Sequence, residues 1–111
     1  MKFIRRNYWK TIFYKVPLSP LTKERINTVF SLMDRKTASH LLSKKCGITL
    51  PKMASVEAED FERIRFAAIK LSNGKLVELE RLIDEAHVNC HGLVERAGFG
   101  EDPKAHLDWL P

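Results

Sequence analysis

Glycine, proline and cysteine are scarce in this chain of 111 residues, which contains five glycines, five prolines and two cysteines. The scattered glycines form no glycine-rich loop of the kind that binds phosphate groups. Two cysteines are too few for a disulfide framework, and the first residues show no secretory-signal pattern. The apolar stretches fall far short of the roughly 20 residues that a membrane-spanning helix needs. These absences predict a cytoplasmic protein without a membrane span.

The length and composition predict one packed domain. A chain of 111 residues, of which 44% are hydrophobic and 30% charged, has the composition of a globular protein. This length is sufficient for a hydrophobic core but too short for two independently stable units. We therefore expect a single domain over residues 1–111.

Acidic residues are nearly absent from the first half of the chain. Residues 1–52 contain twelve Lys and Arg but only two acids, Glu24 and Asp34, whereas residues 53–111 contain seven Lys and Arg and twelve acids. A net charge of +10 in the first half is therefore followed by one of −5 in the second. Such a basic half favours an acidic partner, which is nucleic acid, anionic lipid or an acidic protein face. The alternative is that both halves only expose solvated charges.

Residues 1–16 form a basic segment rich in aromatic side chains. Apolar residues recur there at helical spacing, which favours a helix, although residues 11–16 are also β-prone. Cations attract phosphate, and aromatic rings stack on bases or lie at a membrane surface, so the segment is a candidate partner-binding site. The alternative is that its aromatic rings belong to the core. The candidate residues are Lys2, Arg5, Arg6, Tyr8, Trp9, Lys10 and Lys15.

Two short helices are expected between Ser19 and Gly47. Ser19 is a suitable N-cap, and Pro20 suits the first helical position because its missing N–H has no partner there. Asp34 is the expected cap of the second helix, which ends at Gly47. The apolar stripe expected on the first helix consists of Ile26, Val29, Phe30 and Met33.

Residues 55–111 have the clearest helical pattern. Ser55 is the expected cap of a helix over residues 56–72, whose acids come first and whose cations come later, as the helix dipole favours. Asn73 and Gly74 end this helix and begin an antiparallel partner, so we expect a helical hairpin. Short C-terminal helices follow it.

The first of these C-terminal helices is expected to begin at Asn89 and to end at Gly98, and a last helical turn follows Pro103. The whole chain is therefore predicted to be an all-α, single compact domain of five to six short helices.

His87, Cys90 and His91 have a spacing that brings three metal-capable atoms to one helical face, where His106 or Cys46 would complete a tetrahedral zinc site. We favour the alternative of polar groups at a helix junction. Asn89 and Gly92 are expected to break the helix there, and no Cys-x-x-Cys pair supplies further ligands. No convergent catalytic set is evident either. The sequence therefore predicts no metal, no cofactor and no enzymatic activity, with a metal-dependent or thiol enzyme as the competing hypothesis.

Several motifs of the second half carry a family resemblance. Residues 62–72 read ERIRFAAIKLS, residues 97–100 read AGFG, and His106 and Trp109 follow. This pattern resembles a group of small, uncharacterised bacterial helical proteins with an IRFAALKLS…AGFG…H…W C-terminal half. The resemblance covers roughly the last half of the chain and concerns helix-packing and helix-stop residues, so it implies a fold and no catalytic residues.

The group also has an Asp-Trp-Arg-Asp-like run where residues 89–92 of this chain read NCHG, which weakens the zinc hypothesis. Proteins of this kind are sometimes encoded beside toxins. The resemblance therefore implies a non-enzymatic protein-binding module of the immunity or antitoxin type that neutralises a partner toxin through a charged face. The alternative is a nucleic-acid-binding protein that uses the basic N-terminal segment.

Overall fold

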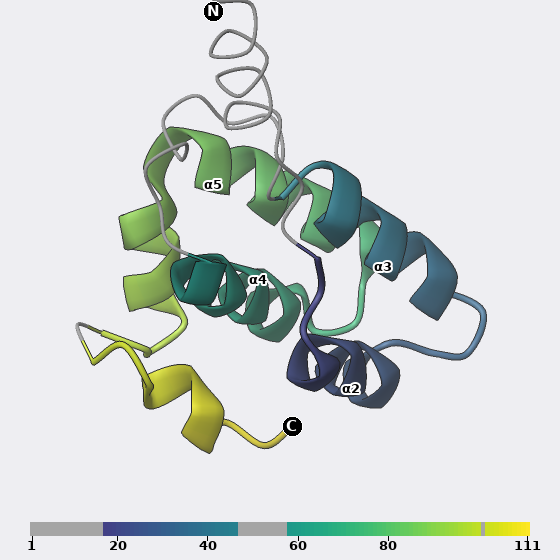
Figure 1. Cartoon of the computed structure of the whole chain (residues 1–111). Helices are drawn as coiled ribbons and strands as arrows, with labels where there is room; N and C mark the ends of the chain where they lie inside the picture. Colours follow the sequence, from purple (N-terminus) through teal and green to yellow (C-terminus); the bar gives the residue numbers. More distant parts are fainter. Residues whose placement is uncertain (1–16, 47–57, 101) are drawn as a thin grey trace, which may run out of the picture.

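The computed structural model describes residues 17–46, 58–100 and 102–111, and this part of the chain is entirely helical. The all-α prediction is confirmed, but the described residues form four α-helices and one short 3₁₀ helix rather than five to six helices (Figure 1). No described helix is both long enough and apolar enough to cross a bilayer. The helices are α2 (Pro20–Val29), α3 (Arg35–Lys44), α4 (Ala58–Ser72), α5 (Leu76–Arg96) and the 3₁₀ helix η2 (Ala105–Asp108).

Helix α4 lies at the centre of the described structure. It packs along α5, against α2 and against η2, while α3 packs against α2 and α5. After α5 the chain turns back, so that η2 and the C-terminal tail end near α2 (Figure 1). The helices share one hydrophobic core, whose largest fully buried apolar members are Ile26, Phe30, Leu42, Phe66, Ile69, Leu79, Leu82, Ile83 and Leu93.

The start of α2 forms as the sequence predicts. The Oγ of Ser19 accepts a hydrogen bond of 3.1 Å from the backbone N–H of Thr22, and Pro20 occupies the first turn. The end differs from the prediction, because α2 stops at Val29 and Phe30 is extended. The Phe30 side chain is buried, as predicted. Met33 was predicted to lie on the same buried stripe, but it lies beyond the helix and is 90% exposed.

The predicted cap of α3 is wrong in one respect. Asp34 precedes α3, and its carbonyl accepts from the backbone N–H of Ala38 at 2.9 Å, but its carboxylate makes no capping hydrogen bond. The physical reason is that Asp34 has helical backbone angles, with φ −96° and ψ −12°, instead of the extended angles that aim a capping side chain at the first turn. The expected helix end at Gly47 and the expected cap at Ser55 lie outside the described residues.

The helical hairpin of α4 and α5 is confirmed, and its turn uses the residues predicted for it. Asn73 and Gly74 both have positive φ angles, of 53° and 79°. A Cβ atom on Gly74 would lie 2.7 Å from the carbonyl oxygen of Val29. Glycine therefore allows the hairpin turn to approach the end of α2 closely.

Helix α5 combines two predicted helices, the antiparallel partner of α4 and the helix expected to begin at Asn89. Its backbone is non-helical at Asn89, with φ −152° and ψ 80°, and the Asn89 side chain accepts from the N–H of Gly92 at 2.9 Å. The predicted cap therefore forms, but inside one kinked helix. This joining lowers the helix count relative to the prediction.

The end of α5 also follows the sequence. Gly98 has a φ of 86°, its N–H donates to the Glu95 carbonyl at 2.9 Å, and the Phe99 N–H donates to the Val94 carbonyl at 3.1 Å. These two hydrogen bonds form a Schellman motif, and Phe99 is buried beneath it as the accompanying hydrophobic contact.

Candidate functional site

The basic N-terminal candidates lie outside the described residues. This applies to Lys2, Arg5, Arg6, Tyr8, Trp9, Lys10 and Lys15. Their role in binding a partner stays a prediction, and the site is therefore built from the side chains that the structure describes.

His87 of α5 is held by a contact with the end of α3. The ring Nε2 of His87 lies 2.9 Å from the backbone carbonyl oxygen of Lys45, and the kink at Asn89 separates His87 from His91. Among the described residues, no group of three or more His, Cys, Asp and Glu side chains is placed to hold a metal ion. His87 therefore joins the end of α3 to α5.

Cys46 lies fully buried at the end of α3, beside the buried Arg65 of α4. Burial raises the pKa of the Cys46 thiol to about 11, and the nearby Arg65 guanidinium only partly opposes this shift. Arg65 donates from Nε to the Cys46 carbonyl at 2.9 Å and from Nη1 to the Pro17 carbonyl at 3.0 Å. The thiol thus stays protonated at neutral pH, and Arg65 connects three segments of the chain.

A partly buried polar cluster of Ser19, Glu62 and His106 connects α2, α4 and η2. The Ser19 hydroxyl donates to Glu62 Oε2 at 2.5 Å, and His106 Nε2 lies 2.7 Å from Glu62 Oε1. A nucleophilic serine needs a base that accepts its proton, but here the histidine and the serine both contact the carboxylate. The serine oxygen also caps α2. This arrangement holds three elements together.

The motifs that carry the family resemblance converge on the same region. Phe66 packs edge-on against His106, with ring centroids 4.9 Å apart, and against Trp109 at 6.1 Å. The ammonium of Lys70 donates to the Ala97 carbonyl at 2.6 Å and lies 5.2 Å from the centroid of the Phe99 ring. These motif residues attach η2 and the end of α5 to α4, so their roles are in packing.

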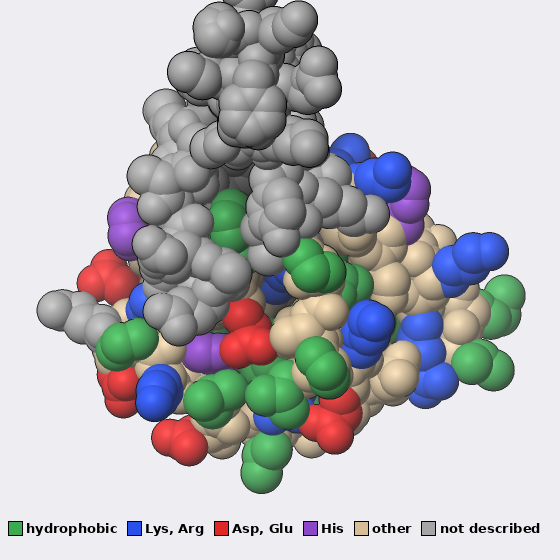
Figure 2. Space-filling view, viewed as in Figure 1, with side chains coloured by type: hydrophobic (Ala, Val, Ile, Leu, Met, Phe, Trp, Pro, Cys, Tyr) green, Lys and Arg blue, Asp and Glu red, His purple; other side chains and the backbone are tan. Residues whose placement is uncertain are grey.

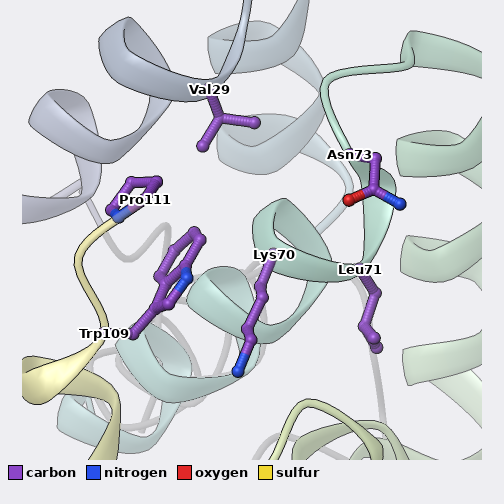
Figure 3. Close-up of a pocket in the computed structure, with 6 residues that line it drawn as sticks. All are labelled: Val29, Lys70, Leu71, Asn73, Trp109 and Pro111. Atoms are coloured by element: carbon purple, nitrogen blue, oxygen red, sulfur yellow. The ribbon is translucent and has the colours of Figure 1, made fainter.

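A cleft opens where the C-terminal tail returns to α2 (Figure 3). It has a volume of about 550 Å³. Val29, Trp109 and Pro111 converge on it, whereas the Lys70 ammonium points away toward Ala97 (Figure 3). The cleft thus presents polar and apolar atoms in similar amounts. Its lining residues are Val29, Lys70, Leu71, Asn73, Trp109 and Pro111.

Exposed basic side chains gather on α3. Lys36, His40 and Lys44 lie at every fourth position and are exposed, and we call them the basic face of α3. Within the described part of the chain these three side chains make no hydrogen bond or ion pair. Residues 35–46 contain no acidic residue. The opposite side of α3 carries the buried Ala38 and Leu42, so the helix is amphipathic and its basic side faces solvent.

The surface of α5 has the opposite charge. Its exposed acids include Glu80, Asp84 and Glu95. Lys45 donates to Glu80 at 2.7 Å, and this contact raises the pKa of Lys45. In Figure 2, Lys and Arg gather at the right-hand edge where α3 lies, and acids gather toward the left and the bottom. Among the described helices, α3 therefore carries exposed cations and α5 carries an excess of acids.

The basic face of α3 is a candidate site that the sequence analysis did not predict, because cations are denser and mixed with aromatic rings in residues 1–16. Its signal in the sequence is the spacing of basic residues by four on a segment without acids.

Comparisons with protein-family models, with characterised proteins and with solved structures gave no match.

Proposed function

We propose that this protein is a non-enzymatic protein-binding module of the immunity or antitoxin type, which neutralises a toxin by covering an acidic part of its surface. The observation that carries the proposal is the basic face of α3, where Lys36, His40 and Lys44 are exposed without partners in the described part of the chain. The family resemblance of the second half supports the toxin-related role.

The placement of α3 suits a preorganised binding surface. Ala38 and Leu42 are buried beneath it, and contacts from Arg65 and His87 hold its C-terminal end. A surface that is fixed before binding loses little conformational entropy when a partner docks. The acidic surface of α5 adds orientation, because a partner with an acidic patch is attracted to one side of the molecule and repelled by the other.

Two side chains of the kind that enzymes use as nucleophiles, Cys46 and Ser19, are engaged in the fold. The Cys46 thiol is buried with a pKa of about 11, and the Ser19 hydroxyl contacts Glu62 and caps α2. These contacts support a binding role over a thiol enzyme that uses Cys46. The other cysteine, Cys90, is free and half-buried.

Co-expression with the product of the neighbouring gene tests the proposal. We expect co-purification and protection of cells from that product. The double variant Lys36→Glu/Lys44→Glu should weaken binding by at least about tenfold, because like charges across an interface are strongly unfavourable. The matched control is Lys75→Glu/Lys104→Glu, which reverses two exposed lysines outside α3 and should retain binding. Absence of both co-purification and protection would remove the toxin-neutralising role.

Nucleic acid is the second candidate partner, because the same basic face is able to contact phosphate groups. It ranks second because tight nucleic-acid binding commonly uses about 6–10 phosphate contacts, and α3 offers three basic side chains on this face. The basic N-terminal segment, which the sequence predicts for nucleic-acid binding, lies outside the described residues. Gel shifts with duplex DNA and with single-stranded RNA test it. Binding at low salt that falls steeply as salt rises would support this candidate, and no shift at low salt would remove it.

A further inference from the structure

The turn between α2 and α3 exposes two consecutive large hydrophobic side chains. Leu32 is 77% exposed and Met33 is 90% exposed. The turn backbone is fixed, because the N–H groups of Asp34 and Arg35 both donate to the Ser31 carbonyl, at 2.9 and 3.1 Å. Burial of Phe30 anchors the start of this turn. Leu32 and Met33 therefore project into solvent from an ordered turn.

Cations stand beside these two side chains. The Arg35 guanidinium donates from Nε to the Phe30 carbonyl at 3.2 Å, which keeps it at the turn, and the exposed Lys36 follows. Asp34 is the one acidic residue between Leu32 and Lys36. Figure 2 shows hydrophobic and basic side chains together at the right-hand edge, where Figure 1 places this turn.

The other strongly exposed aliphatic side chains have a different setting. Leu110 of the C-terminal tail is 76% exposed, and the nearest charged residue along the chain is an acid, Asp108. The others lie on α5. Val77 and Val88 are 80% and 75% exposed, but they are single residues on a helix whose surface is acidic. Isolated exposed hydrophobic residues are ordinary in globular proteins. The pair at the α2–α3 turn differs because it combines adjacent apolar side chains, a protruding backbone and neighbouring cations.

We propose that the α2–α3 turn is a peripheral membrane-binding site for anionic lipid. Leu32 and Met33 insert at the boundary between headgroups and acyl chains, while Arg35 and Lys36 bind lipid phosphate and carboxylate groups. Apolar insertion combined with attraction to anionic headgroups is the general basis of interfacial binding. The inference goes beyond the proposed function, because it requires no protein partner.

A membrane fits this surface better than a second copy of the chain does. A bilayer accepts a protruding turn without a matching pocket, whereas a second copy of the chain would bring Arg35 and Lys36 against their own like charges. Lys44 lies two helical turns farther along α3 than Lys36. The turn and the far end of the basic face are therefore separable by substitution.

Flotation with lipid vesicles tests the proposal. The full chain should bind vesicles made of equal parts phosphatidylcholine and phosphatidylserine, and bind vesicles of phosphatidylcholine alone much more weakly. The double variant Leu32→Ser/Met33→Ser should lower the partition coefficient by at least about tenfold, because two apolar side chains that insert into the membrane are lost. The control Val77→Ser/Val88→Ser also removes two exposed aliphatic side chains and should change it less than about twofold. Circular dichroism checks that each variant is folded.

Three results would overturn the proposal: no binding of the wild-type chain to the anionic vesicles at low salt, unchanged binding by Leu32→Ser/Met33→Ser, or equal binding to both vesicle types. The second result would show that cations elsewhere on the chain hold the vesicle. Because the neighbouring-gene product is not in this assay, its outcome is independent of the toxin-neutralising proposal.

Discussion

Two regions of this molecule use their polar side chains in opposite ways. Around α4, Ser19 and His106 both contact the Glu62 carboxylate in a partly buried cluster. On α3, Lys36 and Lys44 face solvent and have no partner in the described part of the chain. The first set of side chains makes contacts that stabilise the fold, whereas the second set is exposed and can contact a partner. Substitutions around α4 should therefore lower stability, and substitutions on α3 should alter binding.

The largest effect on stability is expected from Arg65→Ala. This change removes a buried guanidinium and leaves the carbonyl groups of Cys46 and Pro17 without their hydrogen bonds. Loss of two charge-assisted hydrogen bonds together with a cavity should lower the free energy of unfolding by about 3–5 kcal/mol. Urea denaturation followed by circular dichroism measures it. A loss below about 1 kcal/mol would show that the connection made by Arg65 is unimportant.

Alkaline pH should weaken the protein through Cys46. The thiol has a pKa of about 11 in the fold against an ordinary value of 9.0, so the native state holds the proton more tightly than the unfolded state. This contribution is complete below pH 9 and is lost as the pH rises toward 11. It amounts to about 2–3 kcal/mol at most. Comparison of urea midpoints for wild type and Cys46→Ala across this range isolates the effect, and parallel pH curves would contradict it.

Gly74→Ala should destabilise the junction of α2 with the helical hairpin. The new Cβ would stand 2.7 Å from the Val29 carbonyl oxygen at a positive φ, which costs about 2 kcal/mol. Gly100→Ala is the matched control, because Gly100 also has a positive φ but has no other atom within 4 Å of the added Cβ. Thermal denaturation should therefore show a larger loss for Gly74→Ala. Equal losses would mean that only the φ angle matters.

His106→Phe separates ring packing from the hydrogen bond to Glu62. The phenyl ring keeps an edge-on contact with Phe66, but Glu62 loses a donor. The expected loss of stability is about 1–2 kcal/mol. His106→Ala should cost more because it also removes the packing. If the two variants were equally stable, the ring contacts would contribute nothing.

The smallest effect on stability is expected from Lys36→Glu/Lys44→Glu. Both side chains are exposed and unpaired within the described structure, so the free energy of unfolding should change by less than about 0.5 kcal/mol. Chemical denaturation measures it. A large loss would erase the contrast between the two regions, because α3 charges would then contribute to folding.

Local signals predicted much of the fold. The cap at Ser19, the turn at Asn73 and Gly74 and the stop at Gly98 were predictable because each depends on the backbone preference of one or two residues. Asn89 was correctly predicted as a cap, but the joining of two helices into α5 was not predicted.

The remaining features depend on contacts between distant residues. The pairing of Glu62 with His106 joins residues 44 positions apart, which spacing alone does not reveal. The exposure of Met33 follows from the early end of α2, which has no glycine or proline signal. The basic face of α3 was visible as a pattern, but its exposure became clear only from the burial of Ala38 and Leu42 on the opposite side.

The affinity of the protein for the neighbouring-gene product, measured by calorimetry over a range of salt concentrations, tests the central claim most directly. We predict that wild type binds with an affinity that falls as salt rises, that Lys75→Glu/Lys104→Glu behaves like wild type, and that Lys36→Glu/Lys44→Glu binds at least about tenfold more weakly while remaining equally stable. Wild-type affinity in the folded Lys36→Glu/Lys44→Glu variant would contradict the assignment of α3 as the binding surface.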